Sequence, residues 1–223
     1  MSEVSFFKLD SINLAQNNIH FFFIFLSVKY EPSDFRSDVI FLMDSSRFVT
    51  KENYMLEKNY VKLMARLLNL ANNRSRSALY AYSDLPMLQI TFDGYEDREA
   101  FETAVNRALH LQRARRIDRA LVAAAELLRT RSRPSVPKYV ILLTTGRQTQ
   151  VADTRSLRET SQQIRSYGGR LFVVAILTGG YNVRDFYQAV QRPEDVISVP
   201  SFISLLPRAS FMASRIMATW RKL

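Results

Sequence analysis

Residues 39–48 read Val-Ile-Phe-Leu-Met-Asp-Ser-Ser-Arg-Phe, an apolar run that ends in a carboxylate and two hydroxyls. Branched and aromatic residues without a polar interruption are typical of a strand that is buried on both faces of a parallel sheet. The loops that follow the carboxyl ends of such strands build ligand sites. Asp44 and Ser46 therefore stand where oxygen ligands for a divalent cation are expected.

Strand-like and helix-like stretches alternate after this run, which predicts an α/β fold with a doubly wound parallel sheet. The expected strands are residues 39–43, 78–82, 88–92, 139–143, 171–177 and 196–199. Thr50 is expected to cap a helix whose buried face includes Glu57, Tyr60 and Val61. Further helices are expected around 101–108, 117–128, 153–167 and 185–191, and the last one begins near Leu205.

The composition is that of an ordinary globular domain, with 223 residues, 47% hydrophobic and 23% charged. Cysteine is absent, so no disulfide is available, and with two histidines, His20 and His110, zinc and copper sites are disfavoured. The formal net charge of +10 favours acidic partners such as sulfated glycans or acidic proteins. Nucleic acid is disfavoured because no binding motif or aromatic platform accompanies the arginines.

Residues 1–36 form an N-terminal extension with an apolar run at 19–28. The run is shorter than the roughly 20 helical residues that span a bilayer, so no membrane span is expected. As a signal peptide it is unconvincing, because acidic residues precede it and no small-residue cleavage site follows Leu26. A signal-anchor, an extra strand and residues from an incorrect gene model all remain open.

Several segments, in order and at these intervals, resemble the von Willebrand factor type A domain, in the subclass found in matrilins and collagen VI. They include Asp38–Ser46, Tyr82-Ser83-Asp84, Val136–Thr144, Phe172–Ile176 and Val199–Phe202. The resemblance runs from about Ser37 to Thr219 and implies a type A domain over residues 37–220. It also implies that one edge strand of the sheet is antiparallel.

The resemblance implies a metal-ion-dependent adhesion site that is degenerate here. Relatives that bind Mg²⁺ or Mn²⁺ use an Asp-x-Ser-x-Ser loop, a threonine and a second aspartate. Asp44 and Ser46 match, whereas Phe48, Arg115 and Thr145 stand at the other three positions. Like unit charges about 4 Å apart repel by roughly 4 kcal/mol at an effective dielectric constant near 20, so a guanidinium here disfavours a dication. No metal or other cofactor is therefore expected.

Two alternatives describe the arginines beside this site. In one, Arg115 or Arg116 reaches Asp44 and replaces the cation through a charge-assisted hydrogen bond. In the other, both arginines lie in solvent.

The implied function is a non-catalytic module for protein–protein or extracellular-matrix interaction, since no nucleophile elbow, P-loop or dinucleotide motif occurs. The expected ligand is a protein or matrix component, and the resemblance places the protein outside the cell. The partner-binding face is expected to comprise Asp44, Ser46, Arg47, Arg113, Arg115, Arg116 and Thr145. The alternatives are a self-assembling, homo-oligomeric matrix scaffold, a glycosaminoglycan-binding domain that uses the arginines between Arg113 and Arg133, and an intracellular type A scaffold.

Overall fold

The computed structural model describes residues 35–70, 74–179 and 183–219, and of Trp220 the backbone alone. The expectations for the N-terminal extension, including the apolar run at 19–28, lie outside these residues. None of the described helices is both long enough and apolar enough to cross a bilayer.

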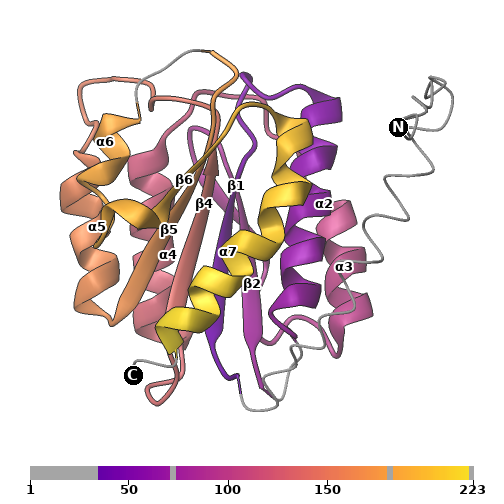
Figure 1. Cartoon of the computed structure of the whole chain (residues 1–223). Coiled ribbons are helices and arrows are strands. Elements are labelled where there is room, and N and C mark those ends of the chain that lie inside the picture. The colour runs from indigo at the N-terminus through magenta and orange to yellow at the C-terminus, as the bar shows by residue number, and fades with distance from the viewer. Residues whose placement is uncertain (1–34, 71–73, 180–182, 221–223) are drawn as a thin grey trace, which may run out of the picture. The chain divides into compact units, whose positions relative to one another are not determined.

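A six-stranded sheet forms the centre of the fold (Figure 1). Its strands lie in the order β3-β2-β1-β4-β5-β6, and all neighbours are parallel except β3, which is antiparallel to β2. The doubly wound sheet with one antiparallel edge strand is thereby confirmed. The strands are β1 (Asp38–Asp44), β2 (Arg76–Tyr82), β3 (Pro86–Ile90), β4 (Lys138–Thr144), β5 (Gly169–Ile176) and β6 (Val196–Val199).

Helices cover both faces of this sheet (Figure 1). One face packs against α2 (Lys51–Leu67), α3 (Arg98–Arg107) and α7 (Leu205–Trp220), and the other against α4 (Ile117–Arg131), α5 (Leu157–Ser166) and α6 (Arg184–Tyr187). Short 3-10 turns occur at Pro193–Asp195 and Phe202–Ser204. Alternate residues of β1 enter the two cores: Phe41 and Met43 face α2, whereas Leu42 faces α4. The apolar run is therefore buried on both sides, as a central parallel strand requires.

Several element boundaries differ from expectation, among them the helix expected at 185–191, which ends at Tyr187, and two of the differences have a clear local cause. The edge strand begins at Pro86 and ends at Ile90, because Asp84 accepts a hydrogen bond from the Leu85 amide (2.9 Å) and closes the hairpin early. The helix expected from residue 153 begins only at Leu157, because the Ser156 side chain caps it by accepting from the Glu159 amide (3.1 Å). The Ser-x-x-Glu pattern is a capping signal that marks this start.

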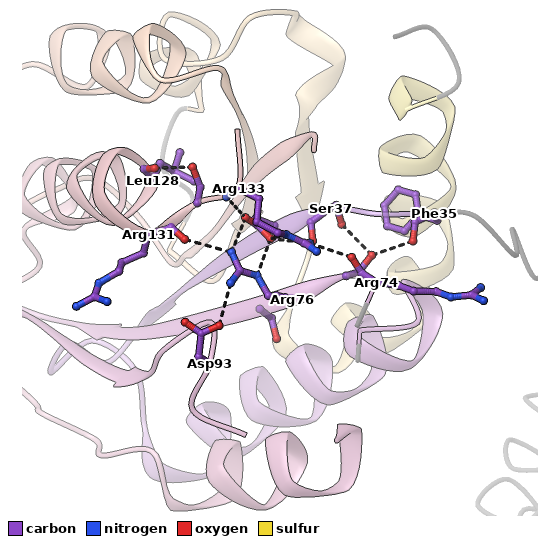
Figure 2. Close-up of polar contacts among 12 residues, drawn as sticks. Phe35, Ser37, Arg74, Arg76, Asp93, Leu128, Arg131 and Arg133 are labelled. Atoms are coloured by element: carbon purple, nitrogen blue, oxygen red, sulfur yellow. Dashed lines mark hydrogen bonds and ion pairs between the residues drawn. The ribbon is translucent and has the colours of Figure 1, made fainter. Parts of the chain in front are cut away.

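The N-terminal end of the sheet is organised around the fully buried carboxylate of Asp38. Arg76 from β2 and Arg133 from the loop before β4 both bind it, at 3.0 Å and 2.8 Å, and Figure 2 shows the two guanidiniums converging there. Arg76 also contacts Asp93 (2.9 Å), while Arg133 donates to the carbonyls of Ser37 and Arg74. One carboxylate thus ties together three segments distant in sequence.

Replacing Asp38 by Asn should lower the free energy of unfolding by about 3–5 kcal/mol, because two largely buried guanidiniums lose their carboxylate. Asp93→Asn is the matched control, since its side chain is 71% exposed and it touches the same network from outside. Its cost should stay below about 1 kcal/mol. Urea denaturation of both variants at pH 7 tests this, and equal losses would contradict it.

Candidate functional site

The candidate site lies where the sheet changes its winding direction, between the carboxyl ends of β1 and β4. These strands are neighbours, yet β1 leads outward to β2 whereas β4 leads to β5 on the other side. Such a switch point is where open α/β sheets bind ligands. The fully buried Asp44 ends β1, and Thr145 follows the last residue of β4.

The Asp44 carboxylate is fully engaged by neighbours. Its Oδ1 accepts from the Ser46 amide (3.1 Å). Its Oδ2 accepts from the amide and the hydroxyl of Thr145 (3.2 and 3.1 Å) and from Arg115 Nε (2.8 Å). Arg115 also donates to the Thr145 hydroxyl. Arg115 therefore reaches Asp44, as the first of the two alternatives for the arginines expects; that this contact replaces a cation is a proposal.

Arg115 connects three loops. Besides Asp44, its guanidinium donates to the Arg147 carbonyl (3.2 Å), and its backbone carbonyl accepts from the Thr149 amide (2.7 Å). The loop before α4 is thereby joined to the ends of β1 and β4. Its side chain is only 6% exposed, so this is a buried, charge-assisted contact of the stronger kind.

Arg116 does not reach Asp44. It binds Asp118 (2.7 Å) and Asp153 (2.8 Å) instead. Although burial favours the neutral acid, hydrogen bonds from Arg116 lower the pKa of Asp118 below its usual value. Hydrogen bonds from Arg119 and Arg116 likewise lower the pKa of Asp153, to about 2. The second arginine thus builds a separate ion-pair cluster.

Phe48 covers the buried pair. The Arg115 guanidinium carbon lies 4.6 Å from the centre of its ring, and that of Arg47 lies 5.3 Å from it. The ring is nevertheless 52% exposed. A phenyl group thus stands between solvent and the guanidinium, an arrangement that cation–π attraction favours.

The seven residues expected on the partner-binding face divide into two groups. Asp44, Ser46, Arg115, Arg116 and Thr145 are buried, whereas Arg47 and Arg113 are exposed. The same end of the domain also exposes Phe48 and Leu109 (54%), which the sequence analysis did not place on this face. Their loops are adjacent, because the Arg47 amide donates to the Arg113 carbonyl and Ser45 Oγ to that of Leu109. We call Arg47, Phe48, Leu109 and Arg113 the ligand-end surface.

The residues present do not fit a divalent cation. Each oxygen of Asp44 already accepts hydrogen bonds, Thr145 offers no carboxylate, and Phe48 has no ligating atom. The Arg115 guanidinium holds the position beside Asp44 with a fixed positive charge. A small cation would have to displace it from a nearly closed site, against like-charge repulsion.

Glu57, on the buried face of α2, is the unexpected member of the site. It is fully buried, and neither carboxyl oxygen has a hydrogen-bond partner among the described residues. Burial and the nearby charge of Asp44 raise its pKa well above the usual value, although the backbone amide of Asp44 and the charge of Arg115 act in the opposite direction. Arg115 is already paired with Asp44, so its charge lowers the pKa of Glu57 by less than burial and the charge of Asp44 raise it. A charged residue on an apolar helical stripe was the signal in the sequence.

The arginines between Arg113 and Arg133 are mostly paired. Arg115, Arg116, Arg119, Arg129 and Arg133 each bind a carboxylate within 3 Å, and Arg113 lies 3.7 Å from Asp84. Arg133 also lies beyond α4, which ends at Arg131, so it is not on that helix. Density of arginine in the sequence therefore overstates the free positive charge of this region.

Glu57→Leu should raise the free energy of unfolding at pH 7.5 by about 1–3 kcal/mol, because an unsatisfied buried polar group disappears. Since the pKa of Glu57 is raised on folding, wild-type stability falls as pH rises above the unfolded-state value of about 4.3, and the gain should shrink toward pH 4.5. Urea denaturation at both pH values measures this. Glu52→Gln is the control: its pKa is lowered by a backbone hydrogen bond and by Thr50, so the variant should not be stabilised.

Comparison with known proteins identifies the fold family. The model of the von Willebrand factor type A domain matches residues 38–206. Proximal thread matrix protein 1 from the mussel byssus has a similar fold, with a TM-score of 0.73 at 19% identity, over 81% of this chain and 48% of that one. Another structure of that protein is described as having a zinc-occupied MIDAS motif (TM-score 0.72).

Curated relatives include matrix proteins. Cuticlin-6 of Caenorhabditis elegans is 25% identical over 75% of this chain and 28% of its own length. Matrilin-1 of Gallus gallus is 22% identical over 62% and 28%, and the human collagen alpha-6(VI) chain is 22% identical over 76% and 7%. The chain thus spans less than a third of each of these relatives. With the matched model covering most of its length, the chain belongs to the von Willebrand factor type A domain family.

Proposed function

We propose that this chain is a non-catalytic interaction module of the extracellular matrix that binds a protein partner through its ligand-end surface without a divalent cation. The observation that carries the proposal is the buried Asp44–Arg115 pair beneath Phe48. Membership of a family with matrilin and collagen VI relatives supports a role in adhesion or matrix interaction outside the cell.

The chemistry of the ligand-end surface supports a direct protein contact. An exposed aromatic ring and two exposed arginines are residue types enriched at protein interfaces, and an exposed leucine adds apolar area beside them. A metal-bridged carboxylate has no place here, because Arg115 is enclosed and its donors point to Asp44, Thr145 and Arg147. Affinity would come instead from burying Phe48 and from pairing Arg47 or Arg113 with acidic groups.

A second candidate function, self-assembly as a matrix scaffold, is favoured by the β3 edge of the sheet. Its residues Pro86–Ile90 carry no charge, and Met87 and Leu88 are exposed. Uncharged apolar edge strands tend to pair with other strands. Sedimentation that depends on protein concentration but not on salt, and that is abolished by Leu88→Lys, would support this alternative.

Magnesium or manganese at 5 mM should leave the melting temperature of the wild type unchanged and give no binding heat in calorimetry. The matched comparison is the triple variant Phe48→Ser, Arg115→Thr and Thr145→Asp, which restores the ligand pattern of metal-binding relatives. In that variant an ion at about ten times its Kd should stabilise the fold by roughly 1.4 kcal/mol. A well-defined 1:1 binding isotherm in the wild type would overturn the metal-free assignment.

Capture from an extracellular-matrix extract tests the binding surface. The wild type should retain its partner equally in EDTA and in magnesium, and Phe48→Ser with Arg47→Gln should reduce recovery about tenfold, equivalent to ~1.4 kcal/mol. Arg208→Gln, an exposed site on α7, is the control and should not change recovery. Recovery that EDTA abolishes, or that the double variant leaves intact, would contradict the proposal.

A further inference from the structure

A second concave site lies at the opposite end of the sheet from Asp44. It is a pocket of about 340 Å³ lined by the first residues of β4 and β5 and by Thr219 near the C-terminal end of α7. Four cationic side chains line it: Lys138, Arg165, Arg170 and Arg192. They come from four separate segments, so no stretch of sequence reveals the cluster.

The positive charge of this pocket is only partly compensated. Asp195 binds Arg170 through both oxygens (2.7 and 2.9 Å) and does not line the pocket itself. The side chains of Lys138 and Arg192 have no hydrogen bond or ion pair with any other described residue. Four cations against one carboxylate leave an excess of three positive charges.

The adjacent helix ends do not account for this excess. The C-termini of α5 and α7 lie at the pocket, and each contributes about half a negative charge. Together they offset about one of the three. This arrangement differs from the ligand end, where nearly every arginine has a carboxylate partner.

The pocket is also preorganised. Arg165 donates to the carbonyls of Ala189 and Val190 (2.8 and 2.7 Å), which fixes its guanidinium. Gly168 adopts a left-handed conformation (φ +76°), and the Lys138 ammonium lies 3.7 Å from where a Cβ at this position would be. Glycine thus forms the wall beside the ammonium without a side chain that would fill the space.

We propose that this pocket binds a tetrahedral oxyanion, a sulfate or phosphate group. Arginine and lysine donors that converge without a lining carboxylate are the recognition chemistry of such groups. The pocket is separate from the ligand-end surface. Gly168 and Gly169 line it without side chains, which leaves room for an oxyanion carried on a larger molecule such as a sulfated glycan.

Amide chemical shifts in NMR titrations provide the direct test. Inorganic sulfate and phosphate are titrated separately, with chloride at matched ionic strength as the reference. Saturable shifts at Gly168, Gly169 and Arg170 are expected with sulfate or phosphate and not with chloride. Lys138→Gln with Arg192→Gln should weaken binding about tenfold or more, because two charge-assisted contacts are lost.

The matched control is Arg47→Gln with Arg113→Gln, which removes the same charge from the ligand-end surface. It should leave oxyanion binding unchanged, and the pocket variant should leave partner capture unchanged, so this proposal and the proposed function fail separately. A heparin-derived tetrasaccharide then distinguishes the sources: tighter binding than either inorganic ion assigns a sulfated glycan, and equal binding assigns a free ion. Equal losses in the two double variants, or shifts that chloride reproduces, would overturn the proposal.

Discussion

The ligand end of this domain depends on one ion pair, Asp44–Arg115, because the loops after β1 and β4 and the loop before α4 all bind to it. Three loops with buried polar groups need a common positive centre, since unpaired buried carboxylates are costly. A guanidinium supplies this positive charge through N–H groups that donate in fixed directions, and it is a permanent part of the chain. A divalent cation, by contrast, leaves and returns with its concentration. The loops here are therefore joined by groups that all belong to the chain itself.

That solution has an electrostatic consequence for Glu57. A dication could balance two carboxylates, whereas one guanidinium balances one. Asp44 pairs with Arg115 through direct hydrogen bonds, so the second acid, Glu57, keeps a raised pKa and has no hydrogen-bond partner among the described residues. The domain carries this cost inside an extensive two-sided core, and the Asp38 cluster provides a fully paired counterpart at the other end of the same strand.

Most of the fold was predictable because central parallel strands appear as continuous apolar runs, and the run at residues 39–43 has no competing interpretation. The predicted ends of elements were wrong where a side-chain hydrogen bond sets the end: Ser156 caps α5, and Asp84 closes the hairpin between β2 and β3. At the site, a contact between Asp44 and either Arg115 or Arg116 was one of two interpretations of the sequence. The sequence did not decide which arginine makes the contact, because the carboxylates of Asp118 and Asp153 that bind Arg116 are brought to it only by the fold. Phe48 and Glu57 were not assigned roles, since exposure of a ring and isolation of a buried acid depend on neighbours that only the tertiary structure brings together.

The distribution of charge separates the two ends of the domain in function as well. At the ligand end the buried arginines are paired with carboxylates. The groups left for a partner are the apolar area around Phe48 and the exposed Arg47 and Arg113, which suits a protein surface. At the other end Lys138 and Arg192 are left without carboxylates in the described residues, and the cations exceed the charge of the helix termini, which suits an anion. If both proposals hold, the two ends of the domain contact different classes of ligand, a protein at the ligand end and an anionic group at the pocket.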